Sequence, residues 1–226
     1  MDLIKLIILS IIQGICEVLP ISSSGHLILF KQLLGINTYG LTLEIILHIG
    51  SLIAVVFYYK KELFEIITYS LNYLKGDKNS KKHFNLLLYL FISTFVTSII
   101  ALLFNSFIEN FFSNIVFLPI FFLITSIIIT FSNHNSKTKS IYDISLTDAI
   151  IVGLFQGIGI IPGISRSGIT YFSLIFPPYY YIIAVIISGI TTYFSLILFS
   201  KIINRNKYYF FSIYLIILSS IIILFL

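Results

Sequence analysis

Four long stretches without Asp, Glu, Lys or Arg constrain this chain more than any other feature of its sequence. They cover residues 84–108, 110–136, 167–200 and 208–226. Each is long enough to cross a hydrocarbon core of about 30 Å as a helix, which takes about 20 residues. Backbone amides in a bilayer must pair within their own segment. The stretches are therefore predicted to be α-helices, in spite of their many Ile and Phe residues.

The composition places the whole chain in a membrane. Of its 226 residues, 58% are hydrophobic and only 10% are charged, which lies outside the range of soluble domains. The single cysteine, Cys16, excludes a disulfide within the chain. Nothing near Met1 has the pattern of a cleavable signal, so we expect the first helix to stay in the mature protein. Basic cytoplasmic loops explain the net charge of +5, and we expect no nucleic-acid partner.

A short pattern occurs twice along the chain. Gln13-Gly14-Ile15 recurs as Gln156-Gly157-Ile158, and Ile21-Ser22-Ser23-Ser24-Gly25 recurs at the same interval as Ile164-Ser165-Arg166-Ser167-Gly168. Each copy has an apolar run, a stretch with Pro, Ser and Gly, and a second apolar run, which predicts a broken helix. Irregular backbone at membrane depth persists only where protein or a water-filled cavity covers it. We therefore expect the polar side chains of both copies to meet in one cavity near the midplane.

Three ordinary spans are expected between the two copies, at about residues 43–59, 84–105 and 113–132. An odd number of crossings inverts the second copy relative to the first. The predicted fold class is all-α, a polytopic integral membrane protein with a single transmembrane domain over residues 1–226. It would consist of two inverted repeats, about 1–110 and 113–226, each with a broken or re-entrant helix pair.

The basic residues predict the orientation of the chain. Three connecting loops are expected to hold them: the first with Lys60, Lys61, Lys75, Lys78, Lys81 and Lys82, the second with Lys137 and Lys139, and the third with Lys201, Arg205 and Lys207. The positive-inside rule places these loops in the cytoplasm and both termini outside. This gives six crossings, with a re-entrant hairpin at residues 2–34 and the second copy as a broken crossing helix.

The first copy brings several chemically active groups into a small space. Gln13 and Glu17 are four residues apart and share one helix face, and the segment from Ser22 to His26 follows at the break. An ionisable residue inside a membrane segment indicates a functional site. The alternative is that Glu17 pairs with Arg166 only to close the two repeats, but such a strut needs neither the hydroxyls nor the histidine.

The second copy carries Arg166, which is the only charged residue between Asp148 and Lys201. Its planar guanidinium suits phosphate oxygens, and backbone amides freed by a helix break favour an anion. An arginine that merely extends to the membrane surface fits less well, because the flanking apolar residues place it deep in the bilayer.

Both copies resemble motifs of the undecaprenyl-diphosphate phosphatases, membrane enzymes linked to bacitracin resistance. The matching segments are Gln13-Gly14, Glu17, Leu19–Leu27, Leu43–Ser51 and Pro162–Thr170. The likeness covers most of the chain. After Thr170, the family pattern has a half-helix, a loop and a further full span, which this chain compresses into Phe172–Pro178. The chain is therefore identified as a shortened member.

The resemblance implies hydrolysis of undecaprenyl diphosphate to the monophosphate and inorganic phosphate, which recycles the lipid carrier for cell-wall synthesis. The site would open to the outer face of the cytoplasmic membrane and use a divalent cation, Mg²⁺ or Ca²⁺. The implied catalytic residues are Glu17, Ser23, His26 and Arg166, with Glu17 also as a metal ligand. The implied substrate-binding residues are Gln13, Ser22, Ser24, Gly25, Gly163, Ser165, Ser167, Gly168 and Thr170.

Several alternatives stay open at the level of sequence. A carrier that flips polyprenyl phosphate would hold the head group without cleaving it, and inverted repeats suit both functions. Ser23 either attacks phosphorus or only orients the phosphate, and Glu44 and His48 either extend the polar cavity or form a helix contact. A homodimer is also left open. A second class of lipid phosphatase is excluded, since it needs a further histidine after Ser165-Arg166 and none follows position 134.

Overall fold

The structure is a computed structural model that describes residues 3–36, 41–112, 115–132, 140–159, 178–204 and 207–225. Regular structure within these ranges is entirely helical, as predicted. The helices are α1 (Leu3–Cys16), α2 (Ser23–Leu33), α3 (Leu41–Tyr58), α4 (Lys60–Leu74), α5 (Lys81–Phe112), α6 (Leu118–Ser132), α7 (Leu146–Gly159), α8 (Pro178–Asn204) and α9 (Tyr209–Phe225), with short 3₁₀ helices at Lys78–Ser80, Ile115–Phe117 and Ile141–Asp143.

The helices have the length and surface of a membrane protein. Within the described ranges, Lys78–Phe104 and Tyr179–Ile203 are long and apolar enough to cross a bilayer, and α3 with α4 would add a third crossing if the two count as one span. Side chains such as Phe91, Phe95 and Leu103 on α5 are 67%, 66% and 74% exposed. Large apolar groups in this number face lipid more favourably than water.

The segment from Lys60 is expected to be a loop because of its charge, and this expectation is wrong. Lys60–Leu74 forms α4. Apolar side chains recur at Leu63, Ile67, Leu71 and Leu74, at the spacing of one helix face. The amphipathic period, rather than the number of basic residues, decides the local structure.

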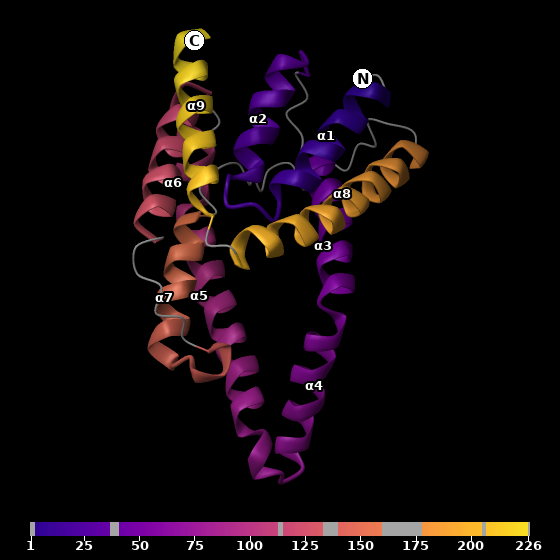
Figure 1. Cartoon of the computed structure of the whole chain (residues 1–226), viewed down its shortest axis with the longest axis vertical. Coiled ribbons are helices and arrows are strands. Elements are labelled where there is room, and N and C mark those ends of the chain that lie inside the picture. The colour runs from indigo at the N-terminus through magenta and orange to yellow at the C-terminus, as the bar shows by residue number, and fades with distance from the viewer. Residues whose placement is uncertain are drawn as a thin grey trace. The chain divides into compact units, whose positions relative to one another are not determined.

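The chain divides into two compact units. The first comprises Met1–Tyr58, Glu109–Ser136 and Gly163–Leu226, and the second comprises Tyr59–Ile108 and Lys137–Pro162. In the first unit α8 packs across α1 and α3, and α6 lies alongside α9 (Figure 1). The helix pair α1–α2 contributes to two buried apolar clusters, through Leu29 to the cluster around Phe122 and through Leu27 to the cluster around Leu47.

Small and hydroxylated residues let α3 and α8 approach closely. A Cβ atom added at Gly50 would lie 2.4 Å from the carbonyl oxygen of Val185. Beside this contact the Ser188 hydroxyl donates to the carbonyl of Leu47 (2.8 Å), and the Thr192 hydroxyl donates to Ser51 Oγ (3.0 Å). Such contacts hold helices together in lipid, where apolar surfaces gain little by meeting each other.

The pair α6–α9 is held together in the same way. Ser126 Oγ lies 2.7 Å from Ser212 Oγ, and Ser212 Oγ lies 2.7 Å from Thr130 Oγ1. Nearer the other end of α9, the Ser219 hydroxyl donates to the carbonyl of Pro119 (2.9 Å). These bonds fix the register of α9 against α6 at two levels.

In the second unit, polar side chains join α5 to α7. The hydroxyls of Ser93 and Thr97 donate to Gln156 Oε1 at 3.0 and 3.2 Å. Gln156 therefore joins two helices, whereas its counterpart in the first copy, Gln13, bonds to Glu17. Between α4 and α5, the Ser80 hydroxyl and the Asn79 amide donate to the carboxylate of Asp77 and lower its pKa.

Candidate active site

The candidate site lies at the break between α1 and α2. The buried face of α1 includes Leu6, Leu9, Gln13 and Cys16, at helical spacing. The helix ends at Cys16, four residues before Pro20, which has no N–H for the Cys16 carbonyl and whose ring would clash with it. The chain then turns over residues 17–22 and enters α2.

Ser22 shapes the start of α2 at an energetic cost. Its φ of 66° is the only positive value of a non-glycine residue in the described part of the chain. This left-handed conformation costs about 1–2 kcal/mol, and strain of this kind often marks functional sites. The Ser22 hydroxyl caps the helix by accepting the Gly25 N–H (3.3 Å). The Ser22 carbonyl accepts both the backbone N–H and the Nδ1–H of His26, at 3.2 and 2.8 Å.

His26 is buried and held at both ring nitrogens. A carbonyl can only accept, so Nδ1 carries the proton in the bond to Ser22, and neutral His26 then presents the lone pair of Nε2. The Tyr214 hydroxyl lies 2.8 Å from Nε2 and donates to it. The imidazole stacks on the Tyr214 ring with 12° between the planes and lies 5.1 Å from the Phe122 ring centre. Gly25 permits this packing, since a Cβ there would lie 2.8 Å from Phe122.

Gln13 and Glu17 form the second part of the site. Gln13 Nε2 donates to Glu17 Oε2 at 2.6 Å, as the spacing of four residues predicts. Gln13 is fully buried, yet its Oε1 has no hydrogen-bond partner among the described residues. An unsatisfied buried acceptor costs about 1–3 kcal/mol. This oxygen is therefore a candidate ligand for a cation or for a donor of the substrate complex.

His48 and Glu44 have different roles, although they share one helix face. His48 donates its Nδ1–H to the carbonyl of Glu44 (2.7 Å), and its Nε2 lies 3.5 Å from Glu17 Oε2. The Glu44 carboxylate instead pairs with Lys31 at 2.5 Å and ties α3 to α2. His48 thus extends the polar cluster, and Glu44 forms a helix contact.

The structure brings together part of the set that the sequence predicts. Gln13 lies with Glu17, and Ser22, Gly25 and His26 lie at one helix start. Ser23 and Ser24 are half-buried in the first turn of α2. The predicted residues of the second copy, Gly163, Ser165, Arg166, Ser167, Gly168 and Thr170, lie outside the described residues.

Sequence reasoning missed Phe122 and Tyr214. Both are aromatic residues within uniformly apolar helices, α6 and α9, far along the chain from His26. No local pattern distinguishes them from residues that face lipid.

The donor set suits a hard cation in part. No group of three His, Cys, Asp or Glu side chains in the described ranges forms a metal site. Glu17 and the unpartnered Gln13 Oε1 nevertheless offer a carboxylate and an amide oxygen, the ligand types that Mg²⁺ and Ca²⁺ take. Mg²⁺ commonly completes its shell with water and substrate phosphates, so two protein ligands fit that use.

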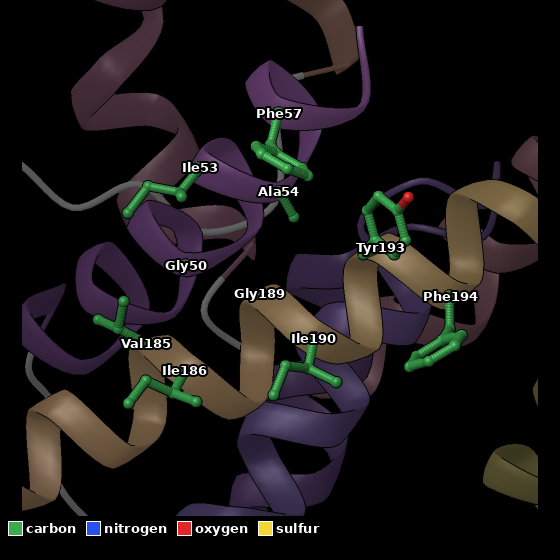
Figure 2. Close-up of a pocket in the computed structure, with 10 residues that line it drawn as sticks. All are labelled: Gly50, Ile53, Ala54, Phe57, Val185, Ile186, Gly189, Ile190, Tyr193 and Phe194. Carbon is green, nitrogen blue, oxygen red and sulfur yellow. The ribbon is translucent and has the colours of Figure 1, made fainter. Parts of the chain in front are cut away.

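An apolar groove of about 510 Å³ begins on α3 half a turn beyond His48. Figure 2 shows side chains of α3 and α8 around it. The lining residues are Gly50, Ile53, Ala54, Phe57, Val185, Ile186, Gly189, Ile190, Tyr193 and Phe194. Such a surface suits a hydrocarbon chain and offers little to a polar ligand.

Comparison with known proteins gives a family match over most of the chain. Residues 6–179 match the family described as bacitracin resistance protein BacA. Undecaprenyl-diphosphatase of Thermosipho africanus is 44% identical over 170 residues, which are 75% of this chain and 65% of that protein. The protein of the same name from Campylobacter curvus is 36% identical over 177 residues, which are 78% of this chain and 66% of that protein.

The match is partial on both sides. The chain spans less than two thirds of the length of these relatives. The family match ends at residue 179, so α9 and nearly all of α8 follow it.

Proposed function

The chain belongs to the family of bacitracin resistance protein BacA, and from this premise we propose that it removes the terminal phosphate from undecaprenyl diphosphate. The observation that carries the proposal is that two polar pairs, Gln13 with Glu17 and Ser22 with His26, flank the break between α1 and α2 inside an apolar helical unit. Buried polar groups are costly in such a setting, and the names of the relatives supply the substrate. These names lend no support to a carrier that only holds the head group.

The reaction needs charge neutralisation and positioning more than covalent chemistry. An oxygen from water or from Ser23 attacks the terminal phosphorus, and the bond from that phosphorus to the bridging oxygen breaks. If Ser23 attacks, water then releases the phosphate. The leaving monophosphate takes up negative charge on the former bridging oxygen. His26 exchanges a proton at Nε2 and not at Nδ1, because Nδ1–H is committed to Ser22.

We propose that Gln13 and Glu17 hold a divalent cation, Mg²⁺ or Ca²⁺. The cation would supply positive charge against the diphosphate oxygens. The support for this role is the pairing of a carboxylate with a buried amide oxygen that no described residue satisfies. His48 Nε2 lies 3.5 Å from Glu17 Oε2 and restricts the rotation of that carboxylate.

We further propose that the substrate lies across the first unit, with its head group at the α1–α2 break and part of its lipid tail in the α3–α8 groove. Arg166 would bind the diphosphate, as its motif implies. The recurrence of the Gln-Gly and Ser-Gly patterns supports two inverted repeats, with residues 2–34 re-entrant. The loop charges support a cytoplasmic membrane location with the site open to the outer face.

Phosphate release by the purified protein in detergent tests the function. Undecaprenyl diphosphate should yield one phosphate per lipid, whereas undecaprenyl monophosphate, which lacks the anhydride bond, should yield none. A protein that releases no phosphate from the diphosphate but moves the lipid between the leaflets of vesicles would refute hydrolysis in favour of the carrier.

A further inference from the structure

Tyr214 contacts the histidine of the candidate site from a helix that the family match does not reach. The matched stretch ends at residue 179, and α9 begins at Tyr209. Tyr214 nevertheless places its hydroxyl 2.8 Å from His26 Nε2 and its ring against the imidazole. Nothing in the proposed chemistry has used this residue so far.

The position of Tyr214 is fixed by the packing of α9 and not by its own side chain alone. Ser212, two residues earlier, bonds to Ser126 and Thr130 of α6. Leu215, the next residue, is fully buried in the same apolar cluster as Phe122. This packing fixes the backbone of Tyr214 beside the imidazole.

The contacts of His26 leave it one tautomer and one ring plane. The carbonyl of Ser22 requires the proton on Nδ1, and the Tyr214 hydroxyl then donates to Nε2. The rings of Phe122 and Tyr214 flank the imidazole and restrict rotation. Without the hydroxyl, only the Ser22 bond and the ring contacts would orient Nε2.

We propose that the Tyr214 hydroxyl, which occupies the lone pair of His26 Nε2, passes on the proton that His26 exchanges with the substrate. The hydroxyl gives its own proton to Nε2 as its oxygen accepts one from the attacking oxygen, and the transfer runs in reverse to the leaving oxygen. The inference rests on the proposed function. Tyr214 itself neither gains nor loses a proton over the cycle. Ser22 orients the imidazole through the other nitrogen, Nδ1, as hydrogen-bond partners do in other enzymes.

Tyr214→Phe is the decisive variant, because it keeps the stacked ring and removes only the hydroxyl. We expect kcat to fall roughly tenfold while KM changes less than twofold. Tyr209→Phe is the matched control, since Tyr209 lies on the same helix and is exposed, and it should keep wild-type kinetics. In a His26→Ala background, adding Tyr214→Phe should cause no further loss of kcat.

A second readout does not need activity. In protein labelled with ¹⁵N-histidine, the Nε2 resonance of His26 should move in Tyr214→Phe, because an accepted hydrogen bond is lost, and should stay in place in Tyr209→Phe. An unchanged kcat in Tyr214→Phe overturns the inference, and so does a loss that persists undiminished in the His26→Ala background. A wild-type protein without phosphatase activity refutes the proposed function instead, and an unmoved Nε2 resonance would then overturn the contact itself.

Discussion

At the scale of single residues, the first copy of the repeated pattern contains two unfavourable features. Ser22 has a left-handed backbone conformation, and Gln13 has a buried oxygen that no described residue satisfies. The first costs about 1–2 kcal/mol and the second about 1–3 kcal/mol, and no packing requirement explains both. Strain and unmet hydrogen-bond capacity on the two sides of one helix break are expected where a ligand completes the structure.

Replacing Glu17 by Gln should abolish most of the turnover. The change removes a negative charge but preserves shape, so we expect kcat for undecaprenyl diphosphate to fall about 100- to 1,000-fold. Glu62→Gln, in an exposed position on α4, is the matched control and should keep wild-type activity. Equal rates in the two variants would show that Glu17 has only a structural role.

Replacing Arg166 by Lys should also be costly, although the charge is kept. A single ammonium does not reproduce the two-pronged grip of a guanidinium on phosphate oxygens. We expect kcat/KM to fall roughly 10- to 100-fold, measured by phosphate release across a range of lipid concentrations. Lys201→Arg, the reverse exchange at a position outside the motifs, is the control and should keep the wild-type kcat/KM. A wild-type kcat/KM in Arg166→Lys would contradict the role of Arg166 in binding phosphate.

The sequence predicts those contacts of the site that are local. Gln13 and Glu17 meet because residues four apart on a helix face each other, and Ser22 meets His26 because the first turn of a helix brings them together. The contact of His26 with Tyr214 has no such signal. It depends on how α9 packs, which the hydrophobic pattern of a uniformly apolar helix does not specify.

At the scale of elements, the uncharged stretches predict where helices form, and close approach of their backbones decides how they pack. The stretch at 84–108 lies within α5, and the stretch at 208–226 contains α9. The same reasoning fails at α4, because counting charges overlooks an amphipathic period. It is also silent on helix pairing, which here depends on glycines and hydroxyls at the contacts of α3 with α8.

Substituting the glycines at the α3–α8 contact should destabilise the protein in a defined order. Gly50→Ala places a methyl group 2.4 Å from a backbone oxygen, which cannot move away as a side chain can, whereas the nearest atom at Gly189 is 3.1 Å away. We expect Gly50→Ala to cost roughly 1–3 kcal/mol and Gly189→Ala less. Thermal unfolding in detergent measures both, and a lower melting temperature for Gly189→Ala than for Gly50→Ala would contradict the packing.

At the scale of the whole molecule, the sequence predicts a helical membrane protein and the family to which the chain belongs. The two compact units interleave segments from both halves of the chain, a division that arises from contacts distant in sequence. Local sequence patterns do not indicate which distant segments pack into the same unit. The orientation across the membrane rests on loop charge and stays a prediction.

Cysteine labelling tests the orientation. Cys16 is the only cysteine and is buried, so a Cys16→Ser background should give little signal. A cysteine at Lys207 should resist an impermeant thiol reagent applied to intact cells, and one at Tyr179 should react, because the basic loop is expected inside. Both positions are exposed, and permeabilised cells should label both. The reverse pattern in intact cells would refute the predicted topology.

The contact between His26 and Tyr214 also affects the order in which the site can form during synthesis. The two residues are 188 positions apart, so a ribosome adding about 5–20 residues per second needs roughly 10 to 40 s to make the second after the first. Ser195, which donates to the carbonyl of Ile15 at the end of α1 (2.9 Å), is also made late. The polar break between α1 and α2 therefore enters the membrane long before its partners exist. During that interval, insertion machinery or a chaperone has to shield it from lipid and from proteases.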